Sequence, residues 1–331
     1  MRVIDVHNHF YPPEYLDVLR AGPSAVRVTE DPDGNPVLHY PGDYNVVVPG
    51  HRDIAYRTRV LEQEGVGQVL SLTTPGVHVE APDLAIALAR LVNDAFAAIV
   101  RARPGRYRAL ATLPLNEPAA AAAELERAVR TLGLPGAMLF GNVNGAPLAH
   151  QRFWPLYEAA DALGAVLMIH PTHPLGVDAM TEYWLMPLVG FPMDTTLAAA
   201  HLVFAGVAER FPRIRWILAH LGGAVPYLAE RLDRGWRAFA DCRAHLTRPP
   251  SEILKEHFWY DTVNFDPGAL ELAIRFAGAG HLLAGSDYPH QIGSIPSMLA
   301  AVRGLPIPEA DTSAMLWRNA EHLLGWGGGT A

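Results

Sequence analysis

Eight short apolar runs alternate with longer stretches of helical period along the chain, and few folds are compatible with that alternation. Short apolar runs rich in branched side chains are typical of buried parallel strands, and the stretches between them are typical of helices that cover such a sheet. The predicted strands span residues 3–6, 68–72, 108–113, 136–140, 165–169, 214–219, 258–263 and 281–285. Predicted helices include residues 82–103, 117–133, 152–164, 195–211 and 267–277. The pattern predicts an α/β protein, a (β/α)8 TIM barrel, with residues 1–331 forming one domain.

Residues 10–50 interrupt this alternation. Within them, VRVTEDPDGNPVLHY (residues 26–40) contains two alternating runs on either side of DPDGN. Turn residues between two such runs favour a hairpin. We therefore predict a small β-hairpin insertion at residues 10–50, directly after the first strand of the barrel.

The formal charge argues against one class of partner. The chain has 26 Lys and Arg residues against 34 Asp and Glu residues, which gives a net charge of −8. Such a chain lacks the basic surface that neutralises phosphate groups, so we expect no binding to nucleic acid.

Cysteine and lysine each occur once, as Cys242 and Lys255. One cysteine cannot form an internal disulfide, which fits a reducing compartment. No apolar run reaches the roughly 20 residues of a membrane span, so we expect no membrane association and a cytoplasmic location. The lone lysine leaves the chain without a P-loop lysine and with at most one candidate for a Schiff base.

Five chemically useful side chains lie at the carboxyl ends of predicted strands. His7 and His9 follow the first strand two residues apart, and in extended backbone their imidazoles point the same way. His170 ends the fifth strand, His220 ends the sixth, and Asp287 follows the eighth. Because the carboxyl ends of barrel strands meet at the face where active sites lie, we expect these side chains to converge.

Imidazoles and a carboxylate that converge form a set of metal ligands. Three neutral imidazoles and one carboxylate suit a divalent cation of borderline softness, such as zinc with a bound water. The alternative is that these histidines belong to the core or the surface, as most of the 15 histidines do. Five polar groups behind apolar strands are costly without a shared partner, so a joint metal site is favoured.

Four motifs carry a resemblance to a known family: DVHNHF, IHP, AHLGG followed by ERLDR, and GSDYP. They resemble the amidohydrolase superfamily, in the branch of aminocarboxymuconate-semialdehyde decarboxylase and related nonoxidative decarboxylases. The resemblance is close from about residue 184 to residue 290 and thinner in residues 80–150. It implies a metal-dependent TIM barrel.

The resemblance implies a role for each converging residue. His7, His9, His170 and Asp287 correspond to the metal ligands of the family. His220 corresponds to the catalytic acid/base beside the metal-bound water. Asp287 is expected to be a catalytic residue as well as a metal ligand.

The same resemblance implies the contacts to substrate. Arg231 matches an arginine that reaches the substrate carboxylate of a neighbouring subunit, which implies a homodimer. Phe10 and Trp184 match aromatic residues around the family's pocket, with plain core packing as the alternative for each. Asn45 stands where the decarboxylase has a substrate-binding arginine, and His290 stands where an aromatic residue is usual. Since the arginine that would bind one substrate carboxylate is missing, we expect the substrate to be a small carboxylate with less negative charge than a dianionic muconate.

The position of the lysine predicts the number of metals. Many amidohydrolases hold two metals bridged by a carboxylated lysine on the fourth strand. Residues 135–143 contain no lysine, and Lys255 precedes the seventh strand. We therefore expect one metal per subunit, Zn2+ in the first place, with Mn2+ or Fe2+ as alternatives.

These expectations combine into one leading function and two alternatives. The leading prediction is a mononuclear, zinc-dependent, nonoxidative decarboxylase of a small unsaturated or aromatic carboxylic acid. The second is a hydrolase of the same branch that cleaves a lactone, an amide or a C–C bond, because both reactions use the same groups. The third is a catalytically silent barrel, which is disfavoured because His220 and the ligand residues are all present.

Overall fold

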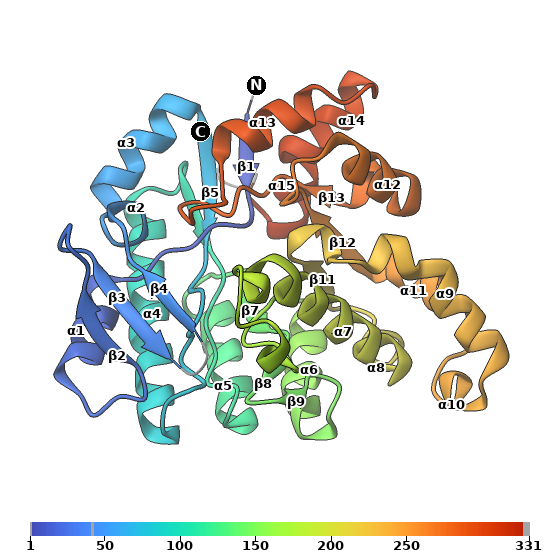
Figure 1. Cartoon of the computed structure of the whole chain (residues 1–331), viewed down its shortest axis with the longest axis horizontal. Helices are drawn as coiled ribbons and strands as arrows, with labels where there is room; N and C mark the ends of the chain where they lie inside the picture. Colours follow the sequence, from blue (N-terminus) through green and yellow to red (C-terminus); the bar gives the residue numbers. More distant parts are fainter. Residues whose placement is uncertain (1, 41–42, 327–331) are drawn as a thin grey trace.

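The structure is a computed structural model that describes residues 2–40 and 43–326. Its core is built from eight parallel strands (Figure 1). Hydrogen bonds between neighbouring strands divide them into two sheets, with the orders β1-β5-β6 and β7-β10-β11-β12-β13. The strands are β1 (Val3–Asp5), β5 (Val66–Leu70), β6 (Tyr107–Ala109), β7 (Gly136–Phe140), β10 (Val166–His170), β11 (Arg215–Leu218), β12 (Phe258–Asp261) and β13 (Leu282–Leu283). All eight overlap the apolar runs that predicted strands.

Backbone hydrogen bonds join the two groups of strands at both ends. Beyond β6, the amide of Ala111 donates to the carbonyl of Gly136 at 2.9 Å, and the amide of Met138 donates back to Ala111. Between β13 and β1, the amide of Val6 donates to the carbonyl of Ala284 at 2.8 Å. The strands thus follow the cyclic order of a TIM barrel, and the predicted (β/α)8 fold is confirmed.

Amphipathic helices cover the outside of the strands (Figure 1). In the longest of them, α4, the apolar residues Leu88, Val92 and Phe96 recur every four positions and are buried. Among the described residues, no helix is long and apolar enough to cross a membrane. The covering helices are α3 (Ile54–Glu64), α4 (Pro82–Ala102), α5 (Pro118–Arg130), α6 (Trp154–Leu163), α7 (Phe191–Phe204), α8 (Val207–Arg210), α9 (Val225–Ala238), α11 (Pro250–His257), α12 (Pro267–Ala277), α13 (Ile295–Arg303), α14 (Glu309–Ser313) and α15 (Asn319–Leu324). The short helix α10 (Ala240–Arg243) lies beyond the end of α9, away from the strands (Figure 1).

One expected helix is broken in two. The apolar pattern predicts a single helix over residues 195–211, whereas the structure ends α7 at Phe204 and starts α8 at Val207. Between them Gly206 has a φ of 70°, and a Cβ there would lie 2.8 Å from the carbonyl oxygen of His245. Only glycine fits this left-handed position, so the helix ends here although the apolar period continues.

The insertion after the first strand contains one strand more than the predicted hairpin. Its antiparallel sheet has β2 (Arg27–Glu30), β3 (Pro36–Tyr40) and β4 (Asp43–Val46), and it lies between α1 (Pro13–Ala21) and α2 (Pro49–Arg52). Residues 41 and 42, which fall within the predicted insertion, lie outside the described residues. The sequence of β4 is DYNV, and Asp and Asn are depleted in strands, which is why β4 was not predicted. That residues 1–331 form one domain stays a prediction.

Candidate metal centre

Four side chains from the ends of three strands, β1, β10 and β13, meet at the carboxyl end of the barrel. One donor atom from each of His7, His9, His170 and Asp287 lies within 4.8 Å of the other three, and all four residues are buried. The Nε2 atoms of His7 and His9 are 3.2 Å apart, and Asp287 Oδ1 lies 3.1 Å from His9 Nε2 and 3.4 Å from His7 Nε2. We refer to these four residues as the ligand cluster.

In each imidazole of the ligand cluster, the Nδ1 atom is within hydrogen-bonding distance of a group outside the cluster. His7 Nδ1 donates to Asp261 Oδ2 at 2.5 Å, and His170 Nδ1 donates to the carbonyl of Pro171 at 2.7 Å. His9 Nδ1 lies 3.3 Å from Ser71 Oγ, whose own proton goes to the carbonyl of Asn8. With Nδ1 protonated in this way, each Nε2 keeps its lone pair and can bind a metal.

The electrostatics favour the same state at two of the three imidazoles. Burial lowers the pKa of His9 and of His170 well below the ordinary value, which keeps both rings neutral. Burial alone would lower the pKa of His7 too, but the Asp261 carboxylate beside it raises that pKa above the ordinary value. Burial would raise the pKa of Asp287, but the neighbouring imidazoles of His220 and His9 hold it well below its usual range. Imidazoles around an ionised carboxylate are the donor set of a divalent metal, so the residues fit a cation of that kind.

Asp261 organises two parts of the site and was not predicted. Besides the ring of His7, its carboxylate accepts the backbone amides of His220 at 3.1 Å, Leu221 at 3.0 Å and Val263 at 2.9 Å. His220 and Leu221 have φ angles of 53° and 57°, a left-handed turn that these bonds stabilise. The signal in the sequence was a lone carboxylate inside the apolar run FWYDTV.

His220 lies beside the ligand cluster and faces the solvent-accessible side. Its Nε2 atom is 3.9 Å from Asp287 Oδ2, and its ring centroid is 4.9 Å from that of His7. The side chain is 13% exposed, against 0% for His7. A substrate that enters the cavity can therefore reach the His220 imidazole.

A second buried network supports the backbone that carries the ligands, and it was not predicted either. Arg57 is fully buried and donates to the carbonyl of His9 at 2.6 Å and to Gln68 Oε1 at 2.7 Å. Asp5 accepts from Gln68 at 2.7 Å and from the hydroxyl of Ser286 at 2.6 Å, and burial raises its pKa to about 6. Through these hydrogen bonds, the buried side chains connect the backbone at His9 with the segment at Ser286.

A cavity of about 370 Å³ opens above the ligand cluster. Its polar lining includes His170, His220 and Asp287 from the barrel, together with His51 and His290. The remaining lining residues come mainly from the insertion, from η3 (Met186–Gly190) with the residues before it, and from the segment after Asp287: Tyr40, Asp43, Tyr44, Asn45, Val46, Val48, Thr73, Thr74, Trp184, Pro187, Leu188, Phe191, Pro289, Gln291 and Ile292.

Two of the predicted substrate contacts line this cavity. Asn45 is on β4, where its side-chain amide donates to the hydroxyl of Tyr11 at 2.6 Å. Trp184 is 57% exposed, with a φ of 58°, and its ring meets that of Tyr44 edge-on at 5.6 Å. The insertion and the segment before η3 therefore meet at the cavity.

The two other predicted contacts do not line the cavity of the described chain. Phe10 is buried in the core, where the guanidinium of Arg57 lies 5.7 Å from its ring centre. Arg231 is exposed on the outer helix α9. Phe10 thus packs as a core residue, and Arg231 can meet a substrate only in another subunit.

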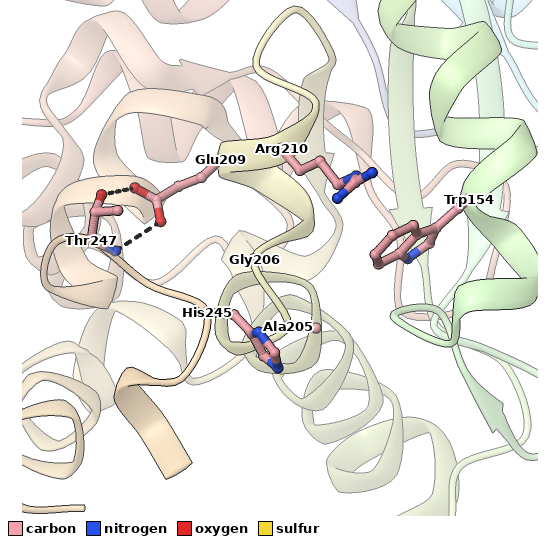
Figure 2. Close-up of a pocket in the computed structure, with 7 residues that line it drawn as sticks. All are labelled: Trp154, Ala205, Gly206, Glu209, Arg210, His245 and Thr247. Carbon is pink, nitrogen blue, oxygen red and sulfur yellow. Dashed lines mark hydrogen bonds between the residues drawn. The ribbon is translucent and has the colours of Figure 1, made fainter. Parts of the chain in front are cut away.

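A second hollow, of about 460 Å³, lies on the outside of the barrel (Figure 2). Its charged groups are already paired, since Glu209 accepts the hydroxyl of Thr247 at 2.8 Å and Arg210 lies 4.3 Å from the ring centre of Trp154. None of the ligand cluster lines it, so the chemistry belongs to the first cavity.

Comparison with known proteins agrees with the fold. The amidohydrolase family profile matches residues 4–326. The 2-amino-3-carboxymuconate-6-semialdehyde decarboxylase of Dictyostelium discoideum is 35% identical over 247 residues, 74% of this chain and 68% of that protein. The 6-methylsalicylic acid decarboxylase of Penicillium expansum is 32% identical over 296 residues, 88% of this chain and 86% of that one.

One related solved structure contains a bound metal ion. The dihydroxybenzoic acid decarboxylase from Polaromonas sp. JS666, with bound manganese and the inhibitor 2-nitroresorcinol, superposes with a TM-score of 0.81 and 29% identity. The match covers 98% of this chain and 97% of that chain. The chain belongs to the amidohydrolase family, as its motifs predicted. It is a metal-dependent enzyme of that family.

Proposed function

We propose that this protein is a nonoxidative decarboxylase of a small aromatic or unsaturated carboxylic acid. The observation that carries the proposal is the ligand cluster with His220 at its edge, at the base of a cavity with aromatic side chains. The relatives are decarboxylases of 6-methylsalicylic acid and of a carboxymuconate semialdehyde, which supports this chemistry over hydrolysis.

The proposed roles follow from position. His7, His9, His170 and Asp287 would hold one divalent cation, which supplies positive charge that orients and polarises the substrate oxygens. His220 reaches the cavity beside them and gives its Nε2 proton to the substrate carbon that bears the carboxylate. The bond from that carbon to the carboxylate then breaks, its electron pair stays with the substrate, and carbon dioxide leaves.

Asp261 would position His220 for this step. Because it holds the left-handed turn at His220 through two amides, it fixes where the imidazole points. Asn45 and Trp184 would contact the distal part of the substrate.

We also propose that one metal is bound per subunit and that it is zinc. Three imidazoles and a carboxylate suit zinc, whereas the Polaromonas relative carries manganese. Removal of metal with a chelator, followed by return of Zn2+, Mn2+ or Fe2+ one at a time, tests the identity. Full activity with zinc supports the proposal, and activity with manganese alone overturns the zinc assignment.

A homodimer is part of the proposal. Exposed apolar side chains lie on α9, the helix that carries Arg231, and on α7: Tyr227 is on α9, and Met193 and Leu197 are on α7. Such surface is stabilised by burial in an interface. Arg231 would then hold the reacting carboxylate in the partner's cavity. Light scattering should give twice the 36.0 kDa of the chain, and a monomer at working concentration would contradict the dimer.

One assay separates decarboxylation from hydrolysis. Metal-loaded protein is incubated with a panel of hydroxybenzoic acids, muconic acids and aromatic lactones, and carbon dioxide and products are quantified. We expect one carbon dioxide per acid consumed and no ring-opened product. Hydrolysis of a lactone or an amide without carbon dioxide release would replace the proposal with a hydrolase.

A further inference from the structure

His51 is a buried histidine whose two ring nitrogens have no hydrogen-bond partner among the described residues. It is 1% exposed, and it lines the cavity above the ligand cluster. An imidazole left in this state loses the hydrogen bonds that water would give it, and protein interiors rarely tolerate such a loss without a purpose. A ligand in the cavity is the partner that the position offers.

A second histidine lies against His51 from the opposite segment. The ring centroids of His51 and His290 are 4.9 Å apart, with the rings inclined at 61°. His290 also lies 5.0 Å from His9, so the pair extends from the ligand cluster towards the wider part of the cavity. We call His51 and His290 the histidine pair.

The charge of the residues that line the cavity restricts which substituents of a ligand can bind at the histidine pair. Among the described residues that line the cavity there is no lysine and no arginine, while Asp43 and Asp287 are both acidic. A divalent cation would balance Asp287 and one substrate carboxylate, and Arg231 of a partner subunit could pair with that same carboxylate. A second carboxylate on the substrate would find no cation in this chain.

The chemistry of a neutral imidazole points to a particular substituent. Burial lowers the pKa of His51 well below its ordinary value, so the ring is neutral and offers one N–H donor and one acceptor nitrogen. A hydroxyl group also has one donor and can accept, so it matches the ring. A carboxylate can accept the N–H of His51, but its charge would then be buried against a neutral ring with no cation of this chain to balance it.

We propose that His51, assisted by His290, is the specificity-determining residue of the site and binds a neutral hydroxyl substituent remote from the reacting carboxylate. The substrate is then an aromatic acid with one carboxylate and at least one hydroxyl, and dicarboxylates are rejected. This inference rests on the proposed decarboxylase function and names the substrate class of that site.

The test is calorimetric binding to the metal-loaded wild-type enzyme, which needs no turnover. The ligands are benzoates that carry a hydroxyl, a methyl or a second carboxyl group at each ring position in turn. At one position we expect the hydroxyl acid to bind at least about tenfold more tightly than the methyl acid, and the dicarboxylate to bind most weakly. Equal binding of the hydroxyl and methyl acids at every position, or tightest binding of a dicarboxylate, overturns the proposal.

A variant locates the preference in the histidine. His51→Phe keeps the ring and removes both nitrogens, so we expect it to lose the hydroxyl preference while affinity for the methyl acid stays within about twofold. The matched control is His78→Phe, because His78 is also buried with an unpartnered Nδ1 but lies outside the cavity lining. A hydroxyl preference that persists in folded His51→Phe overturns the assignment.

The outcomes separate this inference from the proposed function. Hydroxyl preference without carbon dioxide release would leave the histidine pair as the recognition site and remove the decarboxylase. Carbon dioxide release without hydroxyl preference would keep the decarboxylase and remove the role of His51.

Discussion

The base and the rim of the cavity are built in different ways. The base consists of the ligand cluster and His220, which come from the ends of the barrel strands. There the rings of His7 and His9 are fixed by hydrogen bonds that their Nδ1 atoms make to the buried side chains of Asp261 and Ser71. A buried arginine, Arg57, holds the backbone beneath them.

The rim consists of Tyr44 and Asn45 on β4 together with Trp184 and Leu188 around η3. Tyr44, Trp184 and Leu188 are 43%, 57% and 52% exposed. Trp184 is held in the left-handed region and meets the insertion through Tyr44. Few buried polar bonds restrain the rim compared with the base.

The contrast assigns different tasks to the two parts. The base is held by hydrogen bonds at the ring Nδ1 atoms of His7 and His170 and at the backbone of His220, and such a rigid frame suits metal binding and proton transfer, which depend on geometry to within a fraction of an ångström. Apolar side chains at the rim supply contact area that a substrate gains equally in the ground state and the transition state. Changes at the base should therefore lower kcat or metal affinity, and changes at the rim should raise KM.

The largest effect is expected for His220→Ala. Loss of the proton donor should lower kcat by about 10²–10⁴-fold, while metal content stays at the wild-type level because His220 is outside the ligand cluster. Steady-state kinetics and metal analysis on the same sample measure both. His201→Gln, on α7 and away from the cavity lining, is the control; near wild-type turnover in His220→Ala would refute the proton-donor role.

Arg231→Ala should come next. Removal of the guanidinium that each subunit contributes to its partner's cavity is expected to lower kcat/KM by about 100-fold, since a charge-assisted hydrogen bond to the substrate carboxylate is lost. Mixing and refolding Arg231→Ala with His220→Ala should then restore about a quarter of wild-type activity, because half of the dimers are mixed and each has one intact site. No recovery from the mixture, in a sample shown to be dimeric, would place Arg231 outside the neighbouring site.

Asp261→Asn tests whether the base is rigid because of its buried bonds. The amide keeps the size of the side chain but weakens the hold on His7 and on the turn at His220. We expect metal affinity to fall about 10–100-fold, as measured by competition with a chelator. Wild-type affinity in this variant would mean that the geometry of His7 does not depend on Asp261.

Trp184→Ala should give the smallest effect and completes the contrast. KM is expected to rise about tenfold with kcat within about twofold, because apolar contact is lost from both the bound substrate and the transition state. Metal content should not change. A fall in kcat comparable to that of His220→Ala would show that the rim takes part in the chemistry.

The sequence predicted those parts of the molecule that local pattern determines. The continuous apolar runs of buried strands and the 3.6-residue period of helices can be recognised within a few residues, and eight alternations of the two define the barrel. The convergence of His7, His170 and Asp287 then followed, because strand ends meet at one face of that fold.

The missed features depend on partners distant in sequence. Asp261 is tied to His7 and His220 across 254 and 41 positions, and Arg57 reaches His9 across 48. The lone carboxylate in FWYDTV marks Asp261 as unusual, but no residue near Asp261 or Arg57 in the chain identifies their partners. Phe10 shows the converse: an aromatic residue next to a ligand motif packs in the core, which local pattern does not distinguish from a pocket wall.

Calorimetric titration of the metal-free protein with Zn2+ or Mn2+ tests the metal centre most directly. One site per chain is expected in the wild type and in His220→Ala, with loss of that site in His9→Ala and in Asp287→Ala. Two sites per chain, or undiminished binding in both ligand variants, would contradict a single centre held by His7, His9, His170 and Asp287.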